Sequence, residues 1–432
     1  MTSVPGLFGI PVDFILFALT LAGVALFHHH TLRVAVIGLV VITLYKLVFS
    51  HFGGVPGVTG LLTLLGHEWV TVANLFGLLL GFALLSRHFE ESQLPALLPR
   101  YLPDDWKGGF VMLLLVFVLS SFLDNIAAAM IGGSMATVLF KGRLHIGFLA
   151  AIVAASNAGG AGSVVGDTTT TMMWIAGVPP LQVLDAYIAA VPALLFFGVF
   201  AARQQHAFQP ITKDAPAGIH VDWSRLVIVL AILLAAIGAN VYFNLHHPEV
   251  LAQVPVIGLA VWLAITLTGW IRRPDWSLLP SATRASIFLL SLVLCASMMP
   301  VERLPGASWQ TTLGLGFVSA VFDNIPLTAL ALHQGGYDWG LLAYAVGLGG
   351  SMIWFGSSAG VALAGMFPQA RSVGTWVTEG WHVAVGYLIG FACLLFTLGW
   401  QPEAALRRTS SAGTAVPAPA SAGPATHTES KP

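Results

Sequence analysis

The chain has 432 residues, of which 56% are hydrophobic and only 9% are charged, whereas a soluble domain has about 25% charged residues. This composition predicts an all-α protein that crosses a membrane many times, because helices satisfy their own backbone hydrogen bonds in lipid. The net charge of −1 excludes a basic surface for nucleic acid. Two cysteines in apolar segments, Cys295 and Cys393, predict neither a disulfide framework nor a thiol metal site.

Apolar stretches long enough to cross a bilayer, about 17–25 residues, predict the membrane spans. Eight stretches are of this kind: 9–27, 32–50, 70–86, 184–202, 225–244, 253–271, 285–299 and 380–400. Two more, 146–178 and 338–368, contain central glycines and small polar residues and are predicted to cross as broken helices, which makes about 10 spans. Residues 57–67 are apolar but short, and we expect an interfacial turn there.

Two apolar segments, 109–140 and 309–335, each contain a central Asp-Asn-Ile triplet, Asp124-Asn125-Ile126 and Asp323-Asn324-Ile325. An ionisable group at membrane depth is energetically expensive and marks a functional site. Two such groups in corresponding places indicate a transporter whose site lies between two repeats.

The positions of Lys and Arg predict how the chain is oriented. If residues 203–224 are cytoplasmic, most basic residues fall in cytoplasmic loops only when 109–140 and 309–335 each leave the membrane on the side they entered. These two segments are therefore predicted to be re-entrant hairpins, the first open to the cytoplasm and the second to the opposite side.

Two units, 70–202 and 285–400, each consist of a span, an Asp-Asn hairpin, a broken helix and a span. They start on opposite sides, which predicts two inverted repeats. The rest divides into N-terminal spans that form a scaffold (1–69), a linking loop with two spans (203–284) and a tail (401–432). The tail is rich in Ala, Pro, Ser and Thr and is predicted to be disordered.

Each hairpin tip would present a carboxylate, an amide oxygen and free carbonyls, which are hard ligands suited to Na⁺, Li⁺ or H⁺. The alternative is that each Asp only caps a helix N-terminus. In the first broken helix Asp167 precedes four threonines, whereas the second has Ser357-Ser358. Glycines around these residues let the backbone unwind and expose charged helix ends. Small-residue packing between helices is the alternative there.

The charge balance at depth favours a cation. We count three acids at depth, while Lys46 is the only clear basic residue inside a span. A cation that competes with protons for the same carboxylates gives a minimal mechanism for antiport. We find no nucleophile–base arrangement, P-loop or metal-hydrolase motif, so no enzyme activity is expected. No cofactor is expected either, apart from the transported Na⁺ or Li⁺ and H⁺.

Four motifs in this chain resemble the NhaD-type Na⁺/H⁺ antiporters. They are Ser156-Asn157-Ala158-Gly159-Gly160, Gly166-Asp167-Thr168-Thr169-Thr170, Phe322-Asp323-Asn324-Ile325-Pro326-Leu327-Thr328 and Gly349-Gly350-Ser351. These antiporters belong to the ion-transporter superfamily, with arsenite permeases and citrate and dicarboxylate carriers. The resemblance covers roughly residues 70–400. It implies inverted repeats that work by an elevator-like motion.

The resemblance also implies which residues form the site. Dicarboxylate carriers of this superfamily have Ser-Asn-Thr at the hairpin tips, so the Asp-Asn of this chain favours the cation antiporters. The implied ion- and proton-binding residues are Asp124, Asn125, Asp167, Thr168, Asp323, Asn324 and Thr328, with Na⁺ held at Asp124, Asp167 and Asp323. The residues expected to shape the broken helices are Gly159, Gly160, Gly166, Gly350, Ser351 and Ser357.

The sequence therefore predicts a secondary active transporter that exchanges Na⁺ (or Li⁺) for H⁺ in a bacterial inner membrane. One alternative is a cation-coupled citrate or dicarboxylate transporter of the same superfamily. A second, from another class, is a non-transporting membrane scaffold or sensor. The expected partners are small inorganic cations, protons and the lipid bilayer, and the resemblance implies a homodimer formed through the early spans.

Overall fold

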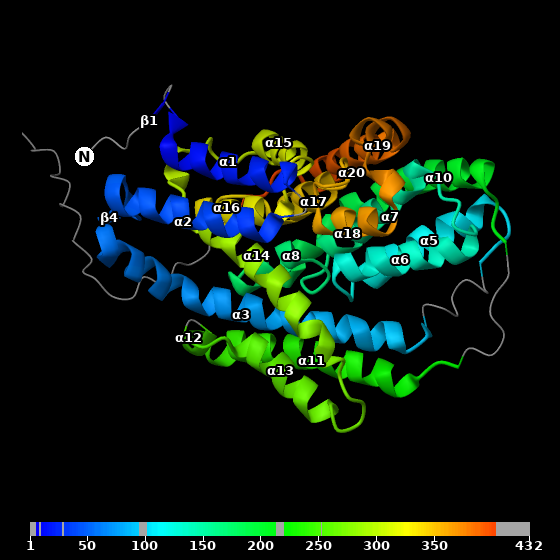
Figure 1. Ribbon diagram of the computed structural model, residues 1–432, viewed down its shortest axis with the longest axis horizontal. Helices are drawn as coiled ribbons and strands as arrows, with labels where there is room; N and C mark the ends of the chain where they lie inside the picture. The colour runs from blue at the N-terminus through cyan, green and yellow to red at the C-terminus, as the bar shows by residue number, and fades with distance from the viewer. Residues whose placement is uncertain are drawn as a thin grey trace, which may run out of the picture.

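A computed structural model describes residues 6–7, 10–27, 30–94, 102–212, 220–251 and 253–402, and this part of the chain is mostly α-helical (Figure 1). The helices of the first half are α1 (Val12–Leu26), α2 (Thr31–Phe49), α3 (Gly57–Glu91), α5 (Trp106–Ser120), α6 (Asn125–Leu139), α7 (Ile146–Ala161), α8 (Thr168–Ile175), α9 (Pro180–Leu184) and α10 (Ala186–Phe208). Short antiparallel pairs precede α1 and α3: β1 (Gly6–Leu7) with β2 (Ile10–Pro11), and β3 (His51–Phe52) with β4 (Val55–Pro56).

The second half is built in the same way, without strands in its described part. Its helices are α11 (Trp223–His246), α12 (Pro248–Leu251), α13 (Val256–Thr268), α14 (Leu279–Ser297), α15 (Trp309–Ser319), α16 (Asn324–Gln334), α17 (Trp339–Gly349), α18 (Ser358–Met366), α19 (Val373–Glu379) and α20 (Trp381–Leu398). Short 3₁₀ turns lie at Trp276–Leu278, Val301–Arg303 and Pro368–Arg371. Residues 403–432 of the tail that the sequence predicts to be disordered lie outside the described residues.

Six helices of the described part are long and apolar enough to cross a membrane, and α1 and α13 are shorter apolar helices. The protein is therefore an all-α integral membrane protein, as predicted. All eight predicted simple spans coincide with helices. The expected turn at residues 57–67 is wrong, because these residues form the beginning of α3. His67 and Glu68 interrupt the apolar run in the sequence, but neither they nor Gly66 break the helix.

Both Asp-Asn segments fold as helical hairpins. A turn after α5 leads into α6, and a turn after α15 leads into α16, with Asp124 and Asp323 as the residues that precede α6 and α16. The Asp-Asn pairs thus stand at the turn between two helices in each segment, where the sequence placed the tips. The side of the membrane from which each hairpin enters, the inverted relation of the two units and the domain limits stay predictions.

Both predicted helix breaks are present. The first separates α7, which ends at Ala161, from α8, which begins at Thr168. The second separates α17, which ends at Gly349, from α18, which begins at Ser358. Every residue of α7 from Gly147 to Ala161 is buried, and so is all of α17. The two broken helices thus form the interior of the molecule.

The two units are packed into each other. Helix α6 of the first hairpin contacts α18 of the second break, and α16 of the second hairpin contacts α8 of the first break. Helices α10 and α20 also pack together. Away from the hairpins, α3 contacts α11, α13 and α14, and α2 contacts α1 and α14 (Figure 1). Helix α3 also contacts α6 of the first hairpin and α8 of the first break.

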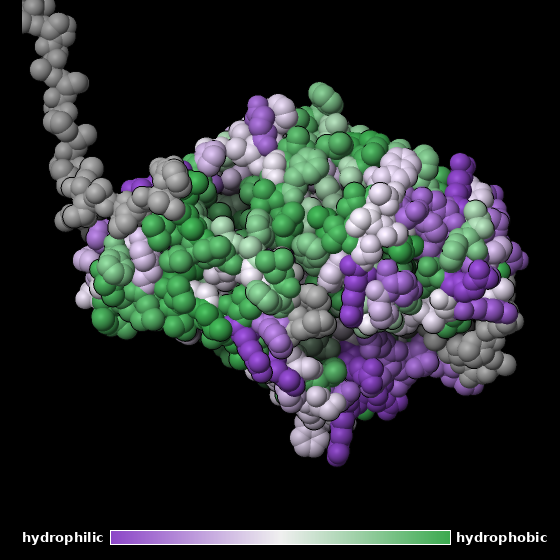
Figure 2. Space-filling view, turned by 45° about the horizontal axis from the view of Figure 1, so that its top comes forward, coloured by the Kyte–Doolittle hydropathy of each residue, from purple (hydrophilic) through white to green (hydrophobic). Residues whose placement is uncertain are grey.

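The surface has the polarity expected of a membrane protein. Large apolar side chains are exposed along α2, α11 and α13. Figure 2 shows hydrophobic residues over much of the visible face, with hydrophilic residues gathered towards the right. Charged residues at the end of α3 and the start of α11 form ion pairs: Arg87 with Glu91, and Arg225 with Glu91 and Asp222. Arg272, which follows α13, also pairs with Asp222.

Candidate functional site

Four helices begin at the centre of the protein, and each has a capping side chain. Asp124 accepts a hydrogen bond from the backbone N–H of Ile126, Asp167 from that of Thr169, and Asp323 from that of Ile325. Ser357 caps α18 in the same way through the N–H of Gly360. The two hairpin acids thus cap helices, as the capping alternative expected, and Asp167 does the same in the first break, where the sequence had suggested no cap. Each cap uses one carboxylate oxygen, so the second oxygen is available for other partners.

Asp167 connects the two hairpin tips. Its Oδ2 accepts hydrogen bonds from the Nδ2 atoms of Asn125, at 3.0 Å, and Asn324, at 3.4 Å. All three side chains are buried, with 2–5% of their surface exposed. Asp167 lies at the start of α8, so residues distant in sequence meet at one oxygen. These hydrogen bonds bring together three elements that the sequence singled out: the two Asp-Asn tips and the first break.

A second set of hydrogen bonds joins the two breaks. Asn157, on α7, donates from Nδ2 to the hydroxyls of Ser351, at 2.9 Å, and Ser357, at 3.1 Å. Its Oδ1 accepts from Asn125 at 3.0 Å. In the second unit the hydroxyl of Ser358 donates to Oδ2 of Asp323 at 3.0 Å. Asn157 thus links the first tip to the second break.

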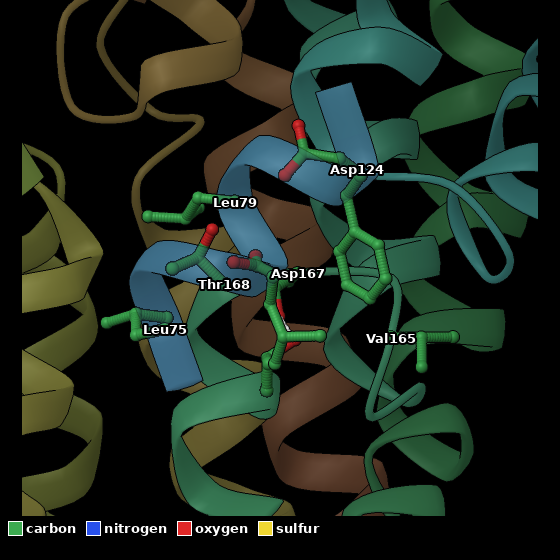
Figure 3. A pocket seen from close by; sticks show the side chains of 9 residues that line it. Leu75, Leu79, Asp124, Val165, Asp167 and Thr168 are labelled. Carbon is green, nitrogen blue, oxygen red and sulfur yellow. Dashed lines mark hydrogen bonds between the residues drawn. The ribbon is translucent and has the colours of Figure 1, made fainter. Parts of the chain in front are cut away.

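A small cavity lies against α3, and Asp124, Asp167 and Thr168 are among the residues that line it (Figure 3). The rest of the lining consists of Leu75, Leu78, Leu79, Phe82, Val165 and Thr171. Its volume is about 10 Å³, about the minimum that one water molecule needs. Asp323 is not part of this lining. Among the described residues, no three His, Cys, Asp or Glu side chains group closely enough to hold a metal ion.

The glycines of the breaks allow the backbones to approach closely. A Cβ atom at Gly160 would lie 2.7 Å from the carbonyl oxygen of Gly166, and one at Gly350 would lie 2.7 Å from that of Gly356. A Cβ at Gly159 would collide with the carbonyl oxygen of Phe117. The glycines therefore serve packing as well as unwinding, as the packing alternative proposed. The contacts of the two breaks match closely.

The two predicted threonines have different surroundings. Thr168 is buried at the first position of α8 and lines the cavity. Thr328 is fully buried, but its hydroxyl donates to the carbonyl of Asn324 one turn earlier in α16. Thr328 therefore supports the second tip from within its own helix, whereas Thr168 lies at the cavity.

No basic side chain forms a recorded bond to the three site carboxylates within the described part of the chain. Lys46 pairs instead with Asp13 at 3.3 Å, and both side chains are at most 3% exposed. Asp13 is a further acid with a buried side chain, which the sequence-based count of three acids at depth did not include. The positive ends of the four capped helices therefore supply the favourable field at the carboxylates.

Two polar residues at the centre were missed as site residues by sequence reasoning. Asn157 was quoted only as part of a motif, and Ser358 only as a contrast to the threonines after Asp167. Asn157 is fully buried and bonded to three side chains, and Ser358 bonds to Asp323. A buried Asn beside a glycine pair, Asn157 before Gly159-Gly160, was the available signal.

The chain is similar to curated sodium/proton antiporters, although no family model matches it. It is 26% identical over 343 residues to the Na⁺/H⁺ antiporter NhaD of Alkalimonas amylolytica, which covers 67% of this chain and 68% of that protein. It is 31% identical to sodium/proton antiporter 1 of Arabidopsis thaliana, covering 60% of this chain and 50% of that protein.

A third relative is the Na⁺/H⁺ antiporter NhaD of Vibrio parahaemolyticus, at 28% identity over 60% of this chain and 72% of that protein. The chain thus spans between half and about seven tenths of the length of these relatives. The similarities confirm the resemblance to NhaD-type antiporters, and they agree with a transporter rather than an enzyme. None of these three relatives is named as a citrate carrier.

Proposed function

We propose that this protein is a secondary active transporter that exchanges Na⁺ (or Li⁺) for H⁺ across a bacterial inner membrane. The observation that supports it most is the small cavity lined by Asp124, Asp167 and Thr168. The names of the similar proteins, Na⁺/H⁺ antiporter and sodium/proton antiporter, agree with this function.

The cavity has the size and chemistry for a small cation. Its volume of about 10 Å³ is near that of a single water-sized probe, so an organic tricarboxylate does not fit. Carboxylate and hydroxyl oxygens are hard ligands, whereas an anion site needs donors such as Arg or Lys. The organic-anion alternative therefore has no specific observation in its favour.

Exchange follows from competition at the same oxygen atoms. A proton on Asp124 or Asp167 occupies a lone pair that a cation needs and removes the charge that attracts the cation. Cation binding in turn requires both carboxylates to be ionised. Only one of the two ions can therefore occupy the site at a time, which is the condition for coupled antiport.

The bonds at Asp167 offer a way to communicate occupancy to both hairpins. The amides of Asn125 and Asn324 donate to the same oxygen, Oδ2 of Asp167. When a proton or a cation takes that oxygen, both bonds weaken together. We propose that this shared loss lets the two tips respond at once. Asp323 would act through Asn324 and Ser358 rather than as a direct ligand of the same ion.

The test is a transport assay with purified protein in liposomes that hold a pre-formed pH gradient. Addition of Na⁺ or Li⁺ is expected to dissipate the gradient, while choline is expected to leave it unchanged. Radiolabelled citrate uptake is measured in the same liposomes. Citrate uptake without a Na⁺ or Li⁺ response would replace the antiporter by the organic-anion carrier, and no response to either would leave the scaffold alternative. The homodimer stays a prediction from the resemblance, and light scattering of the detergent-solubilised protein tests it.

A further inference from the structure

His145 caps the start of α7, the helix that leads into the first break. Its Nδ1 accepts a hydrogen bond from the backbone N–H of Gly147 at 3.2 Å. Its own backbone N–H donates to Oε1 of Gln205 at 2.8 Å. Because Nδ1 accepts a backbone N–H, the ring must hold its single proton on Nε2 and be neutral. The cap is thus made by a ring nitrogen that can accept the backbone N–H only while it carries no proton.

The other side of the ring faces the second unit. Nε2 of His145 lies 3.4 Å from Oε2 of Glu379, at the end of α19. His382, on α20, is the nearby titratable group of that helix, and it contacts Gln204 of α10 rather than Glu379. Phe208 of α10 packs edge-on against the His145 ring, and Arg143 lies over the Phe208 ring. Glu379 is therefore the one recorded ion-pair partner of His145 among the described residues.

A proton on Nδ1 would remove the cap. Nδ1 would then present an N–H to the N–H of Gly147, and a full positive charge would stand at the positive end of the α7 dipole. The ring would be expelled from the helix end and held instead by Glu379. The start of α7 would lose its capping side chain, because the cap of α7 is His145 itself.

A shift at the start of α7 would also displace the far end of the helix, next to the central hydrogen bonds. Helix α7 is buried from Gly147 to Ala161, so it has no solvent-facing side that could absorb a shift. Roughly 20 Å further along, it positions Asn157, which bonds to the first tip and to the second break. The His145 cap and the central hydrogen bonds thus lie at opposite ends of one tightly packed helix.

We propose that His145 is a positioning residue for the ion site: neutral His145 holds α7 in the transport-competent place, and its protonation releases α7 and lowers the maximal exchange rate. This inference rests on the proposed Na⁺/H⁺ exchange. It differs from proton competition at Asp124 and Asp167, because competition is relieved by more Na⁺ and acts on KM. Release of α7 is not relieved by Na⁺ and acts on the maximal rate.

The main test compares the pH profiles of the maximal rate at saturating Na⁺ for the wild type, His145→Asn and His145→Ala. Asn caps a helix as well as any residue and does not titrate. His145→Asn is therefore expected to keep the alkaline rate and to extend it about one pH unit further into the acidic range. His145→Ala, which has no cap, is expected to lower the rate about fivefold at alkaline pH and to flatten the profile.

Glu379→Gln provides an independent variant. It removes the carboxylate that would hold the released imidazolium, so the acidic decline of the rate is expected to change in the same direction as in His145→Asn. The matched control is Glu249→Gln, which alters an exposed His–Glu pair at His247, 3.5 Å apart, beyond the end of α11. The control is expected to keep the wild-type profile.

A second readout does not depend on transport. Hydrogen exchange of peptides from the start of α7, corrected for intrinsic rates, is expected to speed up in the wild type as the pH falls and to stay slow in His145→Asn. If both variants keep the wild-type profile and this protection does not differ, the role of His145 is refuted while Na⁺/H⁺ exchange stands. If Na⁺ and Li⁺ move no protons but the protection differs as stated, the proposed function fails and the cap switch stands.

Discussion

The two helix breaks share one backbone arrangement but differ in chemistry. In both, a glycine on the long helix lies against the carbonyl of a glycine before the short one: Gly160 against Gly166, and Gly350 against Gly356. The next residue caps the short helix in each case, Asp167 in the first break and Ser357 in the second. The backbone thus fixes the same position twice, and only one copy has a carboxylate.

This difference shows that a helix cap and an ion ligand are separable roles. Ser357 shows that a hydroxyl is sufficient to start α18. The carboxylate of Asp167 is therefore more than the cap requires, and its second oxygen receives the amides of both hairpin tips. We therefore propose that the first break is the chemically active one, while the second provides neutral hydrogen-bonding partners.

The largest effect is expected when the first break is given the cap of the second. Asp167→Ser should retain the start of α8 but abolish exchange to background, because the shared acceptor of the two tips and a cavity carboxylate are lost. The pH-gradient assay in liposomes measures this. Asp105→Ser, which replaces an exposed Asp cap at the start of α5, is the matched control and should exchange normally.

The double swap Asp167→Ser with Ser357→Asp extends this prediction. It should stay inactive, because the amides that bond to Asp167 come from Asn125 and Asn324, whereas the partner of Ser357 is Asn157. Recovery of exchange in the double variant would show that the two breaks are interchangeable, which contradicts the asymmetry argued above.

A smaller effect is expected for Ser357→Ala. The change removes the cap of α18 and one acceptor of Asn157. Loss of such a cap costs about 1 kcal/mol, which corresponds to a decrease of about fivefold in the exchange rate if the capped form is the active one. Initial rates at saturating Na⁺ measure it. If Ser357→Ala abolished exchange as completely as Asp167→Ser, the second break would be as important for exchange as the first.

The glycines should respond alike in the two breaks. Gly160→Ala and Gly350→Ala each place a methyl group 2.7 Å from a carbonyl oxygen, and we expect each to lower the stability by about 1–3 kcal/mol. Thermal unfolding in detergent checks this. Gly314→Ala, where no atom lies within 4 Å of the new methyl, is the control. If Gly350→Ala were stable while Gly160→Ala was destabilised, the two breaks would not be packed equally tightly.

The smallest effect is expected outside both breaks, at Asp222 before α11. Hydrogen bonds from the Ser224 hydroxyl and Arg272 lower the pKa of Asp222 from 3.8 to about 2. Folding therefore favours the charged form, and this stabilisation is present above about pH 4 and is lost as the pH falls towards 2. Asp222→Asn should unfold at a slightly lower temperature at neutral pH, with the difference shrinking below pH 4. If the difference in unfolding temperature between the wild type and Asp222→Asn grew on acidification, the charged form of Asp222 would not be the stabilising one.

Sequence reasoning located the parts that depend on local pattern. Apolar length gave the spans, and the glycine clusters gave the breaks near Gly160 and Gly350. The Asp-Asn pairs marked the turns because each stands at the centre of an apolar segment that the distribution of Lys and Arg predicts to be a hairpin. The continuous α3 was missed because residues 57–67 were judged by the short length of their apolar run, although they continue into the next span as one helix.

The hydrogen bonds at the centre could not be predicted in the same way. Asn157 and Ser351 are 194 residues apart in the chain, and Asn324 and Asp167 are 157 apart. Such contacts depend on how whole helices pack, which no local pattern records. The buried pair of Lys46 with Asp13 was missed for the same reason, because each lies near the end of a different span.

The reciprocal packing of α6 on α18 and of α8 on α16 has a mechanical consequence. A helix of each hairpin packs against the broken helix of the other unit. If one hairpin moved alone, it would leave a void in a closely packed interior. We expect the four short helices to be interlocked and to travel as one solid block past α3. An ion bound among these helices would then move across the membrane together with all of its ligands. The two halves of its site would not separate during the movement.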